Sequence, residues 1–176
     1  MTDVLISRDN HIIRIQLNRP QKKNALTPEM YDAMREKIEN ADTDTGVHVI
    51  YITGSEDSFS AGNDLNTFLV DPTSDAAARF IMAISKAQTP IVAAVNGLSI
   101  GVGLTMLLHC DLVYAVDNAV FNFAFIDLGV VPEAASSYLL PQMVGQRRAA
   151  ELLMLGDRFT AQTAYEFGIV NQVVST

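Results

Sequence analysis

Three short apolar runs rich in β-branched residues, each followed by a segment with helical periodicity, constrain the fold of this chain more than any other feature. The runs are residues 47–53, 91–95 and 112–116. Runs of this length and composition are typical of strands buried on both faces, as in parallel sheets. Because strands alternate with helices along the chain, the sequence predicts an α/β fold with a substantial parallel sheet.

The segments around these strands carry their own boundary signals. Residues 27–29 read Thr-Pro-Glu, which supplies an N-cap, a proline at the first helical position and an acid in the first turn. Met30, Met34 and Ile38 then recur on one helical face. Further helices are expected at residues 76–88, 103–110, 134–144, 147–155 and 161–167, with paired strands at 4–7 and 13–17, a loop at 55–62 and a last strand at 169–174.

Composition excludes several classes of protein. The hydrophobic fraction of 49% is too high for a disordered chain, and the most apolar stretch, residues 91–108, is too often interrupted by glycine and polar residues to span a membrane. A net charge of −8 makes nucleic acids and anionic membranes poor partners. No signal peptide is evident and a single cysteine, Cys110, suits a reducing compartment, so we expect a cytoplasmic protein.

The length of 176 residues fits one domain, residues 1–176. Its last predicted strand is apolar, and Val170, Val173 and Val174 have no later element of this sequence to cover them. We therefore expect these valines to be covered by another subunit or by elements outside this sequence.

Two turns with small residues are candidates for binding a developing negative charge. Residues 60–64 follow the first buried strand, and residues 96–103 follow the second and lead into a helix. Backbone N–H groups of two such turns can converge on one oxygen, although ordinary turns between strands and helices are the alternative. His11, His48 and His109 are widely spaced and have no partner at ligand spacing, so no metal site is expected.

Four motifs in unbroken order give a more specific signal. They are NRP at residues 18–20 with NALT at 24–27, FSAGNDL at 59–65, AVNG at 94–97 with GVG at 101–103, and GVVPE at 129–133 followed by LLP at 139–141. Together these motifs resemble the crotonase (enoyl-CoA hydratase/isomerase) superfamily.

This resemblance implies a spiral of repeated ββα units, assembled as a homotrimer or a dimer of trimers. It implies an acyl-CoA thioester as substrate, with coenzyme A as part of the substrate and no separate cofactor. Members of the family usually continue with C-terminal helices beyond the position of Val174, so this C-terminal helical part is expected to be missing.

The family polarises the thioester carbonyl with two backbone amides, which the motifs place at Asn63 and Val102. Lys22 and Lys23 lie where the family often approaches the phosphates of coenzyme A, although solvated loop charges explain them equally well. The resemblance also assigns a set of residues to substrate binding: Lys23, Ala25, Ser60, Ala61, Gly62, Asp64, Leu65 and Gly101.

The side chain that moves protons decides the reaction. Hydratases of the family use two glutamates, and the matching positions here hold Thr105 and Phe125. Isomerases that shift a 3-enoyl double bond resemble this chain in carrying one acid at Glu133. A single carboxylate suffices to remove a proton from C2 and return it at C4.

Glu133 has two interpretations. Its sequence neighbours are apolar (Leu128, Val130, Val131, Ala134 and Ala135), so burial is expected to raise its pKa toward the operating range. The alternative is that Glu133 only complements the dipole of a helix starting at Ala134.

We therefore expect a Δ3,Δ2-enoyl-CoA isomerase of the type found in peroxisomes. The alternatives are another acyl-CoA enzyme of the same fold, either a hydratase or an isomerase of aromatic CoA esters, and a non-catalytic interaction domain.

Overall fold

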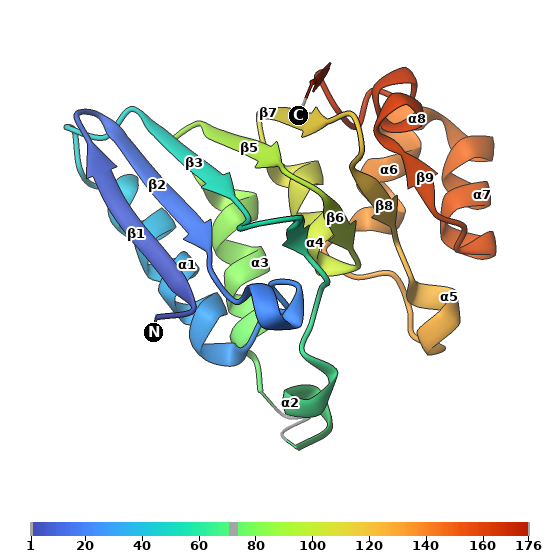
Figure 1. Cartoon of the computed structure of the whole chain (residues 1–176), viewed down its shortest axis with the longest axis horizontal. Coiled ribbons are helices and arrows are strands. Elements are labelled where there is room, and N and C mark those ends of the chain that lie inside the picture. Colours follow the sequence, from blue (N-terminus) through green and yellow to red (C-terminus); the bar gives the residue numbers. More distant parts are fainter. Residues whose placement is uncertain (1, 71–73, 176) are drawn as a thin grey trace.

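Two sheets of different size form the framework of the molecule (Figure 1). The computed structural model describes residues 2–70 and 74–175. Within these residues the larger sheet has the order β1-β2-β3-β5-β7-β10 and the smaller one the order β4-β6-β8-β9. The larger sheet comprises β1 (Val4–Asp9), β2 (Ile12–Leu17), β3 (Val49–Thr53), β5 (Ile91–Val95), β7 (Leu112–Val116) and β10 (Gln172–Val174).

The larger sheet confirms the parallel arrangement predicted from the sequence. β1 and β2 form an antiparallel hairpin, and β2, β3, β5, β7 and β10 then pair in parallel. Ile50, Ile52 and Ala93 on one face of its centre are fully buried. Burial on both faces was expected, but the alternate residues Tyr51, Val92 and Ala94 are only partly buried, so the second face is less completely covered.

The strands of the smaller sheet were not predicted from the sequence pattern. Its strands are β4 (Ser58–Ser60), β6 (Leu98–Ile100), β8 (Val120–Asn122) and β9 (Phe159–Thr160). β4 lies inside the segment expected to be a loop, and β6 directly follows the predicted turn at Asn96-Gly97. Strands of three residues are too short to display the alternation by which strands are identified.

Pairs of strands followed by helices repeat along the chain (Figure 1). In each unit the first strand joins the larger sheet and the second joins the smaller one: β3 with β4, β5 with β6, and β7 with β8. The helices that follow are α2 (Leu65–Val70) and α3 (Ala76–Lys86), then α4 (Val102–Thr105) with the 3-10 helix η2 (Met106–His109), then α5 (Phe125–Leu128). This is the spiral of ββα units that the resemblance implied.

Helices α1 (Pro28–Ala41) and α3 lie side by side against one face of the larger sheet (Figure 1). As predicted, α1 begins after Thr27, whose side chain accepts a hydrogen bond from the backbone N–H of Met30. Met30, Met34 and Ile38 form its buried face. A short 3-10 helix, η1 (Pro20–Lys22), precedes it.

The C-terminal third is helical and packs at the end of the smaller sheet. It contains α6 (Ser136–Val144), α7 (Gln146–Leu155) and α8 (Ala161–Glu166). The prediction that α6 begins at Ala134 is wrong, because Ala134 and Ala135 have left-handed φ angles of 51° and 54°. The predicted helix over residues 103–110 is divided into α4 and η2.

The expectation that the last valines are uncovered is also only partly right. Val170 is 1% exposed and belongs to the core, and Val173 packs partly against it. Val174 is 38% exposed. The strand itself is shorter than predicted, since only Gln172–Val174 pairs with β7. None of the helices in the described residues has the length and apolar character needed to cross a bilayer.

Candidate active site

Two loops that follow neighbouring strands of the smaller sheet run directly against each other. A Cβ atom at Gly62 would lie 2.9 Å from the carbonyl oxygen of Ile100, and one at Gly103 would lie 2.7 Å from that of Ser60. Gly62 also has a φ angle of 89°, which side chains rarely adopt. Glycine at both positions therefore lets the loop carrying Asn63 approach the loop carrying Val102.

The amide of Asn63 stands out within its loop. The N–H groups of Ala61 and Asp64 donate to the carbonyl oxygens of Lys23 and Leu26, both at 2.9 Å. The N–H of Gly62 donates to Ser60 Oγ at 3.1 Å. The N–H of Asn63 donates to no acceptor in the described part of the chain.

The N–H of Val102 also has no acceptor among the described residues, but for a different reason. Val102 is the first residue of α4, where backbone N–H groups have no partner within the helix. Gly101 N–H donates to Asn122 O at 2.9 Å, and the N–H groups of Leu104 and Thr105 both donate to Gly101 O at 2.9 Å. Asn63 forms a β-bridge with Leu26, but the bridge uses the carbonyl oxygen of Gly62 and the N–H of Asp64. The N–H groups of Asn63 and Val102 therefore donate to no acceptor among the described residues, and an oxyanion role requires such free N–H groups.

Glu133 is held at both its backbone and its side chain. Its carbonyl oxygen accepts from the N–H and the Oγ of Ser136, at 2.9 and 2.7 Å. Its carboxylate Oε1 accepts from Thr105 Oγ1 at 2.5 Å. Burial raises the pKa of the Glu133 carboxyl above its ordinary value, and the hydrogen bond from Thr105 opposes part of that rise.

The predicted direction of the pKa shift and its cause, burial, both agree with the structure, but three of the residues expected to bury the carboxyl do not do so. Leu128, Val130 and Val131 are 53%, 48% and 82% exposed, so they do not enclose the carboxylate. The fully buried Thr105 contacts it instead. At the N-terminus of α6 the N–H of Ser136 donates to the carbonyl oxygen of Glu133 and not to its carboxylate. The interpretation of Glu133 as a helix-dipole partner stays a prediction.

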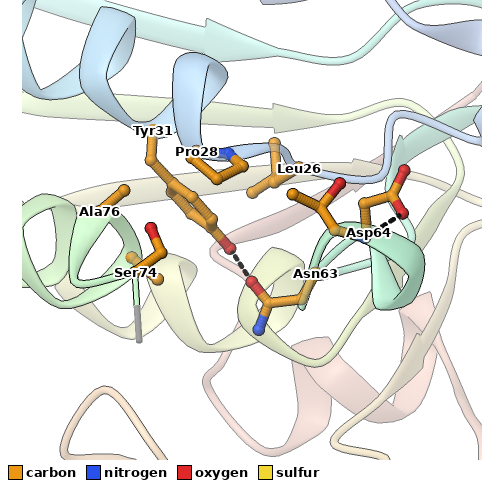
Figure 2. Close-up of a pocket in the computed structure, with 9 residues that line it drawn as sticks. Leu26, Pro28, Tyr31, Asn63, Asp64, Ser74 and Ala76 are labelled. Atoms are coloured by element: carbon orange, nitrogen blue, oxygen red, sulfur yellow. Dashed lines mark hydrogen bonds between the residues drawn. The ribbon is translucent and has the colours of Figure 1, made fainter. Parts of the chain in front are cut away.

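Tyr31 joins the site from α1, and no sequence motif pointed to it beyond its place beside a buried helical face. Its hydroxyl donates to Asn63 Oδ1, and the two side chains point toward one another in Figure 2. Burial, and secondly the negative charge of Glu133, raises the pKa of the Tyr31 phenol well above its ordinary value. Tyr31 therefore lies within electrostatic reach of Glu133 and in contact with Asn63.

A small cavity of about 40 Å³ adjoins this pair (Figure 2). Its walls come from the start of α1, the segment after β4 and the start of α3. Apolar and hydroxyl groups both line it: Leu26, Pro28, Tyr31, Asn63, Asp64, Thr67, Ser74, Ala76 and Ala77.

Two residues assigned to substrate binding by resemblance organise the loops. Asp64 Oδ2 pairs with Arg19 at 2.6 Å, and Asp64 Oδ1 accepts from the N–H of Asn66 at the start of α2. Ser60 Oγ donates to Asn24 O at 2.9 Å, which joins the loop to the segment before α1. Both side chains thus hold the loop that carries Asn63.

Other residues of that set lie nearer the surface. Lys23 is paired with Asp57 at 2.6 Å in an exposed ion pair, and Leu65 is 51% exposed. The carbonyl of Ala25 accepts from Arg19 Nη1 at 3.0 Å.

Across residues 2–70 and 74–175, no group of three or more His, Cys, Asp or Glu side chains is arranged to hold a metal ion.

Comparison with known proteins identifies the family that has this fold and these loops. The family model described as enoyl-CoA hydratase/isomerase matches residues 7–176. The chain belongs to the enoyl-CoA hydratase/isomerase family. The crotonase fold is supported by the solved structure of OdaA from Pseudomonas aeruginosa, which is 41% identical, has a TM-score of 0.96, and is matched over 99% of this chain and 72% of that one.

Curated members of the family that resemble this chain include two isomerases. The mouse peroxisomal enoyl-CoA delta isomerase 3 is 37% identical over 97% of this chain and 56% of its own length. Rat enoyl-CoA delta isomerase 2 is 38% identical over 97% of this chain and 46% of its own length. The chain thus spans about half the length of these two relatives.

Proposed function

We propose that this chain carries the catalytic core of a Δ3,Δ2-enoyl-CoA isomerase. The observation that supports this most directly is the setting of Glu133, a carboxylate with raised pKa whose bonded neighbour is the hydroxyl of Thr105 and not a second acid. The similarity to enoyl-CoA delta isomerases agrees with a reaction that needs one proton carrier.

In this proposal the carbonyl oxygen of the thioester accepts hydrogen bonds from the free N–H groups of Asn63 and Val102. Glu133 removes a proton from C2, and the negative charge that develops on the oxygen is stabilised by the two amides. Glu133 then returns the proton to C4, which leaves the double bond between C2 and C3. Each proton transfer by a positioned carboxyl contributes about 10²–10⁴-fold.

Hydration of 2-enoyl-CoA is the main alternative activity. It requires a second group that activates water, and the two positions where hydratases carry glutamates hold Thr105 and Phe125. Thr105 donates its hydroxyl hydrogen to Glu133, and Phe125 is buried and apolar. Neither side chain activates water, so we expect isomerisation without appreciable hydration.

The test is an assay of purified protein with 3-enoyl-CoA, in which 2-enoyl-CoA and 3-hydroxyacyl-CoA are quantified together. Isomerisation without 3-hydroxyacyl-CoA is expected. Formation of 3-hydroxyacyl-CoA from 2-enoyl-CoA at a comparable rate contradicts the proposal. Binding of acyl-CoA with no turnover of either substrate favours the non-catalytic interaction domain.

We also propose that the protein assembles as a homotrimer or a dimer of trimers. Large apolar side chains are exposed over α5, α6, α7 and the segment between α5 and α6. These side chains are Ile126, Leu128, Val130, Val131, Tyr138, Met143, Met154 and Leu155. Concentrations of exposed apolar surface of this kind favour association with another protein surface.

A further inference from the structure

Thr105 makes an unusual hydrogen bond for a threonine in a helix. Its side chain is fully buried, and its backbone N–H donates to Gly101 O at 2.9 Å. A threonine hydroxyl in a helix commonly bonds the carbonyl of the preceding turn. Here it donates across the site to Glu133 Oε1 at 2.5 Å.

The two oxygens of the Glu133 carboxylate are therefore different. Oε1 is bonded to Thr105, whereas Oε2 accepts no hydrogen bond from the described residues. Among these residues the buried side-chain polar atom without a partner is Asn122 Oδ1, so Oε2 retains accessible surface. A carboxylate with one bonded and one accessible oxygen presents a single atom to a reactant.

We propose that Thr105 is a positioning residue that occupies Oε1 of Glu133 and leaves Oε2 as the one oxygen that carries the proton. This inference rests on the proposed isomerase function. The hydroxyl donates to Oε1 while Glu133 is ionised, and it keeps the same bond when the proton sits on Oε2. The Thr105 bond thus needs no rearrangement between the two proton transfers.

The step balances with Oε2 as the only carrier. The C2–H bond breaks, an O–H bond forms at Oε2, and the electron pair moves into an enolate whose oxygen bears the charge. The O–H bond then breaks as C4–H forms, the carbonyl is restored and the double bond lies between C2 and C3. Use of one oxygen removes any need to pass the proton between the two carboxylate oxygens, which limits its exchange with water.

Two other titratable groups face this segment. Tyr31 approaches from α1, and its raised pKa keeps the phenol protonated. His109 approaches from η2, where its Nε2 lies 2.9 Å from the carbonyl oxygen of Ala134. Since His109 contacts the backbone one residue beyond Glu133, its variants serve poorly as controls, and we place the control elsewhere.

The test compares Thr105→Val, which has the same shape without the hydroxyl, with Thr105→Ser, which restores a donor. Thr53→Val is the matched control, because it removes another hydroxyl, bonded to Ala94 O at 3.0 Å in β3. The substrate is 3-enoyl-CoA deuterated at C2, and the product is analysed for deuterium at C4.

Wild type, Thr105→Ser and Thr53→Val are expected to carry label from C2 to C4. Thr105→Val is expected to lose label to water, with kcat lower by about tenfold, the usual worth of one hydrogen bond to a charged group. Label transfer and kcat unchanged in a folded Thr105→Val protein overturn the inference.

A second measurement separates this inference from the proposed function. Carboxyl carbons labelled with ¹³C are titrated by NMR without substrate, and the Glu133 pKa is expected to be higher in Thr105→Val than in wild type. If wild type does not isomerise 3-enoyl-CoA, the proposed function fails, while this titration still decides whether Thr105 controls the carboxylate. An unchanged Glu133 pKa overturns the role of Thr105 in either case.

Discussion

The partly buried carboxylate of Glu133 lowers the stability of the fold when it is ionised, and it is the proposed proton carrier of the reaction. Replacement by Gln keeps its shape but removes the proton carrier. We expect Glu133→Gln to lower isomerisation by about 10²–10⁴-fold while acyl-CoA binding persists. Steady-state kinetics and a CoA-ester binding isotherm measure this, with the exposed Glu151→Gln as control. Near wild-type turnover in Glu133→Gln contradicts the role given to this residue.

The same variant has a predictable effect on stability. The pKa of Glu133 is raised in the folded protein, so ionisation costs more there than in the unfolded chain. This penalty is absent below the unfolded pKa and develops as pH rises through the folded pKa. Glu133→Gln is therefore expected to unfold at higher denaturant concentration than wild type at neutral pH, and the gain should vanish on acidification. An equal gain at all pH values would point to packing instead.

Arg19 and Asp64 illustrate the opposite case. Their side chains are 16% and 7% exposed, and the hydrogen bond from Arg19 lowers the pKa of Asp64. Arg19→Ala leaves a buried carboxylate without its partner, so we expect a loss of about 3–5 kcal/mol in the free energy of unfolding. The pair's contribution is present above the unfolded pKa of Asp64 and is lost as pH falls through the folded pKa. Denaturant titrations of both proteins across this range test it, and an exposed pair, broken in Lys23→Ala, provides the control.

Single residues also mark the limit of prediction from sequence. The motifs singled out Glu133, Asn63 and Val102, but Thr105 was noted only as a position without a carboxylate. Its bond to Glu133 joins residues 28 positions apart in the sequence. The place of Tyr31 in the site could not be predicted for the same reason, since its partner Asn63 lies 32 positions away.

At the scale of elements, long strands and helices could be predicted and the second sheet could not. Residues 91–95 and 112–116 have the length and composition of buried strands, whereas β4, β6 and β8 have three residues each. These short strands are stabilised by pairing with one another and not by local propensity, so a sequence pattern does not reveal them. They nevertheless position the site, because the loops with the two free amides begin where β4 and β6 end.

Close contact between these loops gives a prediction for Gly103. A Cβ atom there would lie 2.7 Å from Ser60 O, a backbone atom that cannot move without its loop. We expect Gly103→Ala to cost about 1–3 kcal/mol of stability and to lower kcat more than it raises KM, since the loop bearing Asn63 shifts. Gly46→Ala is the control, because its added Cβ meets the flexible end of exposed Arg8. Equal kinetics for the two variants would show that loop spacing does not matter.

At the scale of the whole molecule, the exposed apolar side chains on α5 to α7 predict self-association. Met154 on α7 is 69% exposed, and Met154→Lys is expected to weaken assembly by placing a charge in that surface. Met82 on α3 is 54% exposed, and α3 lies well apart from α7 (Figure 1), so Met82→Lys is the matched control. Sedimentation velocity at micromolar concentration distinguishes the species. A monomeric wild-type protein, or equal effects of the two lysines, contradicts this prediction.

Successive ββα units each deliver one group to the site: Asn63 follows the strand pair of the first unit, Val102 begins the helix of the second, and Glu133 follows the helix of the third. Under the proposed mechanism, the first two units activate the carbonyl and the third determines where protons go. Carbonyl binding and proton transfer then depend on different segments, so the segment after β8 can change while the two amides that bind the thioester oxygen stay the same. New reactions within this architecture are therefore accessible through a few substitutions in one turn of the spiral, provided that residue 105 changes in concert.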